Sequence, residues 1–130
     1  MLVKDCMTKD PVTFSPGEDV RLAFNILTDH KIRQAPVLEN GKLAGIVTDR
    51  DLRLALMETL TEPGLTVRSI MTPNPVTVNE NSLLRDAAKM IGNNKFNALP
   101  VLSDSGKLVG VLTMTDILNG LVKALDDRNE

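Results

Sequence analysis

Two stretches of this sequence share one pattern: Gly45-Ile46-Val47-Thr48-Asp49-Arg50-Asp51 and Gly110-Val111-Leu112-Thr113-Met114-Thr115-Asp116. Each has a glycine, two apolar residues, a threonine and, three residues after the threonine, an aspartate. The apolar part predicts the end of a buried strand, and its glycine indicates a place where another group approaches closely. A threonine with an aspartate three residues later predicts the start of a helix.

A strand that leads into a helix in this way has two interpretations. The first amides of the helix have no partner within it and carry partial positive charge, so a phosphate can bind there with help from the threonine and aspartate side chains. The same two side chains also form a capping box, which closes a helix end without any ligand. Capping requires neither the glycine nor the two apolar residues, and both copies keep them, so the duplication favours the ligand site.

Composition narrows the class of protein. A chain of 130 residues with 42% hydrophobic content predicts one modest domain, or two small halves that share a core. The formal net charge is −2 and there is no long basic run, so nucleic acid is not an expected partner. No stretch approaches the roughly 18 to 20 apolar residues of a membrane span, and the N-terminus is unlike a signal peptide. With Cys6 as its single cysteine, the protein is expected to be soluble and cytoplasmic.

Almost the whole chain is an internal repeat. Twelve of the residues between Val3 and Leu38 recur 64 positions later, and six of the residues between Gly41 and Asp51 recur 65 positions later. The extra residue falls in a predicted hairpin turn, which is Asn40-Gly41 in the first copy and Asp104-Ser105-Gly106 in the second. Both are favoured hairpin loops, of two residues and of three residues with a glycine.

Each copy predicts a brief strand, a helix, a hairpin and a final helix, which together make an α+β fold. We assign repeat 1 to residues 1–62 and repeat 2 to 63–130; each would be too small to be stable alone, so the two are expected to share a core. The predicted strands, helices and final helices lie at 12–14, 18–31 and 49–60 in the first copy and at 76–78, 82–95 and 116–125 in the second. Ser15-Pro16 and Asn79 or Asn81 are candidate starts for the first helix of each copy.

The ordered set of motifs resembles a tandem pair of CBS domains, the Bateman module. The motifs are Met-Thr-x-x-Pro-Val-Thr, a Pro-Val strand and Gly-apolar-apolar-Thr-x-x-Asp, all present twice, and the resemblance covers nearly the whole chain. It implies two β-α-β-β-α repeats packed through their sheets about a pseudo-twofold axis, with two equivalent clefts. In this family the clefts bind AMP, ADP, ATP or S-adenosylmethionine as regulatory ligands, not as catalytic cofactors, and the module regulates an attached or partner protein.

The resemblance also implies roles for individual residues. Asp51 and Asp116 would accept hydrogen bonds from ribose hydroxyls, and Thr48 and Thr113 would contact phosphate oxygens. The adenine would lie against apolar residues, which are Val12, Ala35, Pro36 and Ile46 in the first cleft and Val76, Leu99, Pro100 and Val111 in the second. Packing in the hydrophobic core is the alternative role for each of these apolar residues.

The two clefts are expected to be unequal. Arg33 and Arg50 in the first copy correspond to Asn97 and Met114 in the second. A guanidinium group binds phosphate oxygens through two charge-assisted hydrogen bonds, which neither asparagine nor methionine can reproduce. If the arginines line the first cleft, it should prefer di- or triphosphates, while the second should bind AMP, an uncharged adenosine compound or no ligand. The alternative is that both arginines are solvated surface charges.

Three classes of function therefore stay open: a ligand-sensing module, an oligomerisation or docking module with vestigial sites, and an enzyme. An enzyme is not expected, because the only histidine, His30, and the only cysteine, Cys6, cannot supply a metal cluster or a catalytic triad. His30 is expected at a helix C-terminus. A homodimer is expected because the final helices carry excess apolar residues, which are Leu52, Ala55, Leu56, Met57 and Leu60 in the first copy and Ile117, Leu118, Leu121, Val122 and Leu125 in the second.

Overall fold

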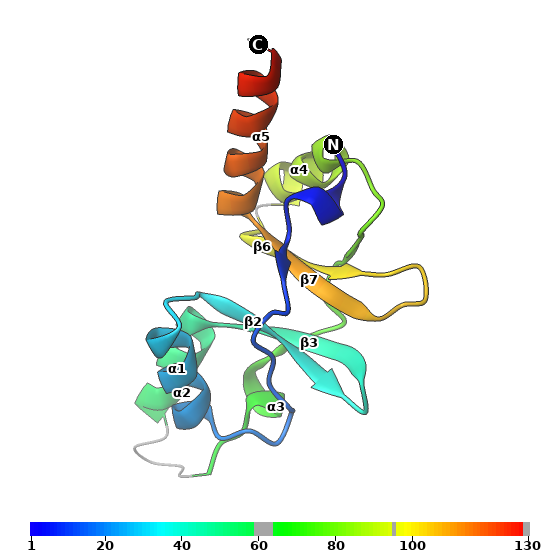
Figure 1. Cartoon of the computed structure of the whole chain (residues 1–130). Helices are drawn as coiled ribbons and strands as arrows, with labels where there is room; N and C mark the ends of the chain where they lie inside the picture. The colour runs from blue at the N-terminus through cyan, green and yellow to red at the C-terminus, as the bar shows by residue number, and fades with distance from the viewer. Residues whose placement is uncertain (59–63, 95, 129–130) are drawn as a thin grey trace. The chain divides into compact units, whose positions relative to one another are not determined.

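The structure is a computed structural model that describes residues 1–58, 64–94 and 96–128. The chain forms two compact units (Figure 1). One, here called the continuous unit, consists of Val12–Pro75. The other, here called the split unit, consists of Met1–Pro11 together with Val76–Glu130. The mixed helix and strand content confirms the predicted α+β class.

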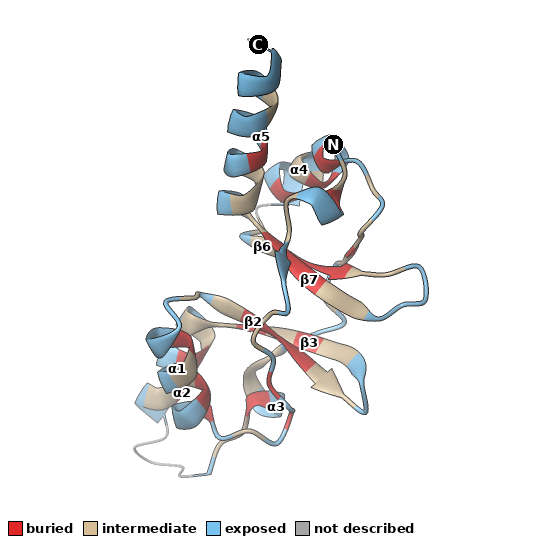
Figure 2. Ribbon diagram, viewed as in Figure 1, coloured by how far each residue is buried: buried red, intermediate tan, exposed pale blue. Residues whose placement is uncertain are grey.

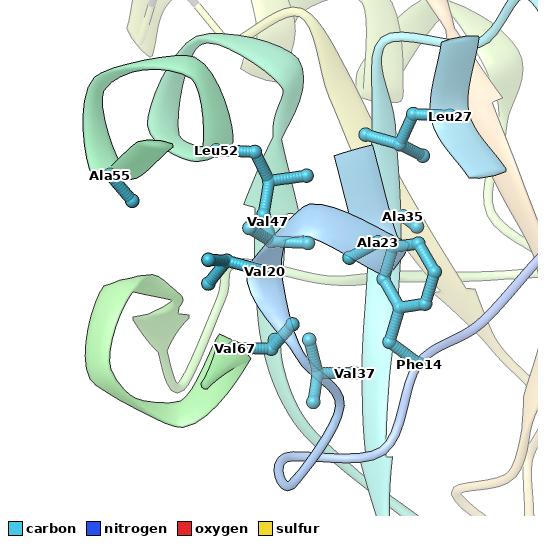
Figure 3. Close-up of a cluster of buried hydrophobic side chains, with 10 residues drawn as sticks. All are labelled: Phe14, Val20, Ala23, Leu27, Ala35, Val37, Val47, Leu52, Ala55 and Val67. Carbon is cyan, nitrogen blue, oxygen red and sulfur yellow. The ribbon is translucent and has the colours of Figure 1, made fainter. Parts of the chain in front are cut away.

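The continuous unit contains a three-stranded antiparallel sheet in the order β2-β3-β4. Its elements are α1 (Val20–Asp29), β2 (Gln34–Glu39), β3 (Lys42–Thr48), α2 (Asp49–Glu58), α3 (Val67–Ile70) and β4 (Thr72–Pro73). Strands β2 and β3 form the predicted hairpin, and α1 packs against α2. The core lies between helices and sheet, where Ala23 and Leu27 of α1 and Leu52 of α2 meet Val37 and Val47 (Figure 3).

The split unit repeats this arrangement with a four-stranded sheet in the order β1-β7-β6-β5, in which only the β5–β6 pair is parallel. Its elements are a 3₁₀ turn (Val3–Asp5), β1 (Thr8–Lys9), β5 (Val78–Asn79), α4 (Leu84–Asn94), β6 (Ala98–Leu102), β7 (Leu108–Thr113) and α5 (Met114–Arg128). Val3, Ala87, Leu99, Val101 and Leu112 are the most deeply buried residues of its core.

The first strand of each sequence repeat completes the sheet that the other repeat mainly builds. Strand β1 pairs with β7, with Thr8 opposite Val111, and β4 pairs with β3, with Thr72 opposite Ile46. The compact units therefore do not coincide with the two sequence repeats. The division into 1–62 and 63–130 is kept as a proposal for the repeats alone.

Both hairpin turns form as predicted. Asn40 and Gly41 have φ values of 53° and 78°, the left-handed conformation that a two-residue turn requires at both positions. Gly106 has a φ of 85° at the end of the three-residue turn, where the Ser103 amide donates to the carbonyl of Lys107 at 2.8 Å. The two turns explain the change of the repeat offset from 64 to 65 positions.

The first helix lies within its predicted range of 18–31, but the predicted start signal, Ser15-Pro16, does not cap it. The cap of α1 is Asp19, whose carboxylate accepts hydrogen bonds from the amides of Arg21 and Leu22 at 2.8 and 3.2 Å. Ser15 instead accepts the Glu18 amide in the preceding turn. The predicted strand 12–14 is reduced to a single bridge between Phe14 and Val37.

The final helices differ in part from the prediction. Leu52 and Ala55 were expected to contribute exposed apolar surface, but both are buried because they form the side of α2 that faces the core. Met57 is 69% exposed, as expected, and Leu54, which the prediction did not include, is 53% exposed. Helix α5 is longer than predicted, and Gly120 is its only buried residue (Figure 2). The predictions for Leu60, for residues 61–63 and for Lys95 lie outside the described residues.

In the part of the chain that the structure describes, no helix is long and apolar enough to cross a membrane.

Candidate functional site

Each threonine–aspartate pair of the doubled pattern forms a capping box. The Thr48 amide donates to the Asp51 carboxylate at 3.2 Å, and the Asp51 amide donates to the Thr48 hydroxyl at 3.1 Å. The corresponding distances between Thr113 and Asp116 are 2.9 and 3.1 Å. All four residues are half-buried. The capping interpretation is therefore confirmed, and any ligand would meet side chains that already close a helix end.

The glycine of each pattern is explained by a neighbouring strand. A Cβ atom on Gly45 would lie 2.7 Å from the carbonyl oxygen of Thr72 and 2.8 Å from Met71 Sδ. A Cβ atom on Gly110 would lie 2.7 Å from the carbonyl oxygen of Thr8. The predicted close approach is thus correct, but the group that approaches belongs to β4 or β1. The glycines are a requirement of the sheet and do not argue for a ligand.

Three predicted site residues in each unit share one face of its sheet. Pro36 pairs directly with Ile46, and Thr48 lies two residues after Ile46 on the same strand. Since side chains alternate along a strand, these three lie on the face opposite Val47, which points into the core. In the split unit the same relation holds for Pro100, Val111 and Thr113. The sheet thus brings apolar side chains to the edge where each helix begins.

The other predicted adenine contacts are divided between core and surface. Ala35 and Leu99 belong to the cores of their units, with exposed fractions of 0% and 1% for the whole residue. Val12 is half-buried and packs against the core of the continuous unit. Val76 is 46% exposed. The packing alternative therefore describes Ala35 and Leu99, and Pro36, Pro100 and Val111 are buried as well.

The two arginines of the first copy lie beside the start of α2. The Asp49 amide donates to the Arg33 carbonyl at 2.8 Å, and Arg50 is the second residue of the helix. Both arginines are exposed, and among the described residues neither side chain makes an ion pair. In the split unit the Met114 amide donates to the Asn97 carbonyl at 3.3 Å, so residues 33 and 97 hold equivalent places. The two arginines therefore have uncharged counterparts in the split unit.

Sequence reasoning missed Thr8. Its hydroxyl donates to the carboxylate of Asp116 at 3.2 Å from both oxygens, across 108 positions of sequence. The repeated Met-Thr dipeptide was the available signal, but only the pairing of β1 with β7 brings Thr8 to Asp116.

Cys6 and His30 have structural surroundings. Burial raises the pKa of the Cys6 thiol above its ordinary value, with further increases from Asp5 and Asp116, and this keeps the thiol protonated near neutral pH. His30 is the C-cap of α1, as predicted, and its Nδ1 lies 2.9 Å from the carbonyl oxygen of Ile26. Within the described ranges, no group of three or more His, Cys, Asp or Glu side chains could hold a metal ion.

The fold and the doubled site define a member of the CBS domain family. The family model for the CBS domain matches this chain twice, over residues 3–58 and 67–123, and the chain belongs to that family. The predicted recognition as a tandem CBS pair is confirmed.

A relative and two solved structures of similar length are similar to this chain. A CBS domain-containing protein of Dictyostelium discoideum is 37% identical over 137 residues, covering 97% of this chain and 94% of its own length. The structure is similar to that of CBSX2 of Arabidopsis thaliana in complex with AMP, with a TM-score of 0.85, 30% identity and coverage of 95% and 97%. It is also similar to the CBS domain pair of protein MJ0100 in complex with 5′-methylthioadenosine and S-adenosyl-L-methionine, with a TM-score of 0.82, 31% identity and coverage of 93% and 99%.

Proposed function

We propose that this protein is a non-enzymatic, cytoplasmic regulatory module that binds an adenosine-containing ligand and signals to an effector protein. The ligand is AMP, ADP or ATP, with S-adenosylmethionine as the alternative. The observation that carries the proposal is the doubled arrangement of a half-exposed aspartate at a helix N-terminus beside an apolar sheet face. It is supported by two neighbours of about the same length, whose structures contain AMP in one case and two adenosine compounds in the other.

The chemistry of each site suits the parts of such a ligand. The first three amides of α2 already donate to Arg33, Asp49 and Thr48, so phosphate would be bound by the hydrogen of the threonine hydroxyl, in the favourable field of the helix N-terminus. A carboxylate repels phosphate, so Asp51 and Asp116 would accept hydrogen bonds from the ribose hydroxyls instead. The adenine would lie on the apolar face. The proposed contacts are Val12, Arg33, Ala35, Pro36, Ile46, Thr48, Arg50 and Asp51 at one site and Val76, Leu99, Pro100, Val111, Thr113 and Asp116 at the other.

We expect that Asp51→Ala and Asp116→Ala each weaken the binding of AMP or ATP at their own site by about tenfold to a hundredfold. Each charge-assisted contact contributes roughly 1.5–3 kcal/mol, which gives this range. Isothermal titration of AMP, ADP, ATP and S-adenosylmethionine into the full chain measures the effect. Asp86→Ala is the matched control, since Asp86 is an exposed aspartate in the first turn of α4 and is not a proposed contact.

The same titration tests the unequal sites. Arg50→Met places the residue of the second site in the first site. It should weaken the binding of ATP more than the binding of AMP, because ATP carries the additional phosphate charge. Equal losses from the two aspartate substitutions, combined with no effect of Arg50→Met, would contradict the asymmetry. If none of the four compounds binds the wild-type chain, the nucleotide proposal fails and a docking module with vestigial sites becomes the better account.

The partner of the exposed apolar helix faces is proposed to be a second copy of this chain. Leu118, Leu121, Val122 and Leu125 form one stripe on α5, and each is between 49% and 56% exposed. Beside this stripe lies an apolar groove of about 390 Å³ between α4 and α5. Apolar surface of this extent is typical of an interface, and symmetric dimers are the commonest assemblies.

We expect light scattering at micromolar concentration to give twice the monomer mass of 14.2 kDa. Leu121→Glu should convert the dimer to a monomer, because it places a charge in the middle of the apolar stripe. Leu22→Glu is the control, since Leu22 on α1 has a similar exposure of 49% but lies outside the stripe. A wild-type species of 14.2 kDa would argue decisively against the dimer.

A further inference from the structure

The carboxylate of Asp116 is already occupied by a hydrogen-bond donor from another part of the chain. Thr8 donates its hydroxyl hydrogen to this carboxylate, with 3.2 Å to each oxygen. The Thr113 amide donates to one of the same oxygens at 2.9 Å. Both carboxylate oxygens of Asp116 are therefore engaged within the split unit.

The equivalent carboxylate in the continuous unit is less occupied. Thr72 corresponds to Thr8 and stands in the same register, opposite Ile46 as Thr8 stands opposite Val111. Asp51 nevertheless receives only the Thr48 amide, on Oδ2, and in the described part of the chain Thr72 makes no hydrogen bond to it. The threonine–aspartate hydrogen bond is therefore present between Thr8 and Asp116 and is not formed between the equivalent residues Thr72 and Asp51.

The contact joins Asp116 to a short strand. Strand β1 comprises only Thr8 and Lys9, and its sheet partners are Val111 and Gly110. Val3 and Met7 anchor the preceding residues in the core, but two residues of pairing give little stability to β1 itself, so the side-chain hydrogen bond of Thr8 adds to what holds this strand. A ligand that takes over the Asp116 carboxylate would remove that bond.

We propose that Thr8 competes with the ligand for Asp116. The inference rests on the proposed function, in which Asp116 accepts the hydroxyls of a ribose. At Asp116 a ribose meets a carboxylate whose two oxygens both already accept the Thr8 hydroxyl, whereas at Asp51 one carboxylate oxygen has no side-chain donor among the described residues. Thr8 thereby lowers the affinity of the second site for the ligand. When a ligand binds there, strand β1 loses its hydrogen bond to Asp116, so β1 responds to whether the second site is occupied.

The test compares Thr8→Val with Thr72→Val, two substitutions that remove the same hydroxyl and keep a residue that favours strands. Each is made where only one site is intact: Thr8→Val in the Asp51→Ala chain and Thr72→Val in the Asp116→Ala chain. AMP is titrated by calorimetry, and hydrogen exchange of β1 is followed with and without AMP. Thermal unfolding verifies that all variants are folded.

We expect Thr8→Val to tighten AMP binding by about threefold to tenfold, because the competing hydrogen bond is long, at 3.2 Å to each oxygen, and contributes about as much as an ordinary hydrogen bond. Thr72→Val should leave AMP binding unchanged. AMP should accelerate exchange in β1 when Thr8 is present and not when it is replaced.

Three results would overturn the proposal. Unchanged affinity in Thr8→Val would show that the hydroxyl does not compete, while the nucleotide function would stand. Weaker binding in Thr8→Val would make Thr8 a direct ligand contact instead. If AMP binds neither the wild-type chain nor any variant, the proposed function fails and this inference fails with it. A wild-type second site that stays empty until Thr8 is replaced would support both.

Discussion

Replacing Leu99 by alanine is expected to lower the free energy of unfolding by about 2–5 kcal/mol, the usual cost of truncating a buried leucine. Leu99 is 1% exposed and lies in the core of the split unit with Val101, Leu112 and Ile91. The substitution removes apolar surface from the core and leaves a cavity that the neighbouring strands cannot close fully. Urea denaturation followed by circular dichroism measures the loss.

Val76→Ala is the matched control for this experiment. Val76 was predicted to contact the same adenine as Leu99, but it is 46% exposed, so its truncation should change stability by less than about 1 kcal/mol. The comparison distinguishes packing in the core from contact with the adenine, the two roles that the sequence left open for the apolar residues. If Leu99→Ala retained full stability and lost only ligand affinity, the assignment of Leu99 to the core would be wrong.

Alanine at Gly45 or Gly110 is expected to destabilise the protein by about 1–3 kcal/mol or more, the range for overpacking. The new Cβ atom would lie 2.7 Å from a main-chain carbonyl oxygen, that of Thr72 or of Thr8. A carbonyl oxygen in a paired strand cannot rotate away as a side chain can, so β4 or β1 must shift from its neighbour. Urea denaturation gives the free energy, and hydrogen exchange of β1 and β4 identifies the strand that has moved.

Gly92→Ala controls for the loss of a flexible residue. Gly92 lies in α4, and a Cβ atom added to it would have no neighbour within 4 Å, so alanine there should raise stability by up to about 1 kcal/mol through helix propensity. Neutral substitutions at Gly45 and Gly110 would contradict the account of these two glycines as sheet requirements. They would make a ligand site the better explanation of the doubled glycine.

Local features of the fold were predictable because neighbouring residues determine them. Asn40-Gly41 requires left-handed conformations at two successive positions, and the structure has them. The Thr48–Asp51 capping box depends on four consecutive residues and forms as its spacing indicates. The internal repeat could be recognised in the sequence for the same reason, since each copy contains the same local signals.

Features that depend on distant contacts were not predictable from the sequence. Helix α2 has apolar residues on several sides, and pattern alone did not select Leu52 and Ala55 as the buried side over Leu54 and Met57. The bond from Thr8 to Asp116 depends on which repeat β1 joins. For the candidate site, the sequence therefore indicated the helix start and its polar residues. That Ala35 and Leu99 lie in the cores depends on how the strands pair, which the sequence pattern does not reveal.

The pairing of β1 with β7 and of β4 with β3 has a consequence for the origin of the chain. A polypeptide with a single repeat would have a sheet that lacks an edge strand and a first strand that lacks a sheet. Two copies of such a polypeptide could satisfy each other by reciprocal exchange, as domain-swapped dimers do. Gene duplication and fusion of an ancestor of this kind would convert an association between molecules into one within a molecule, independent of protein concentration.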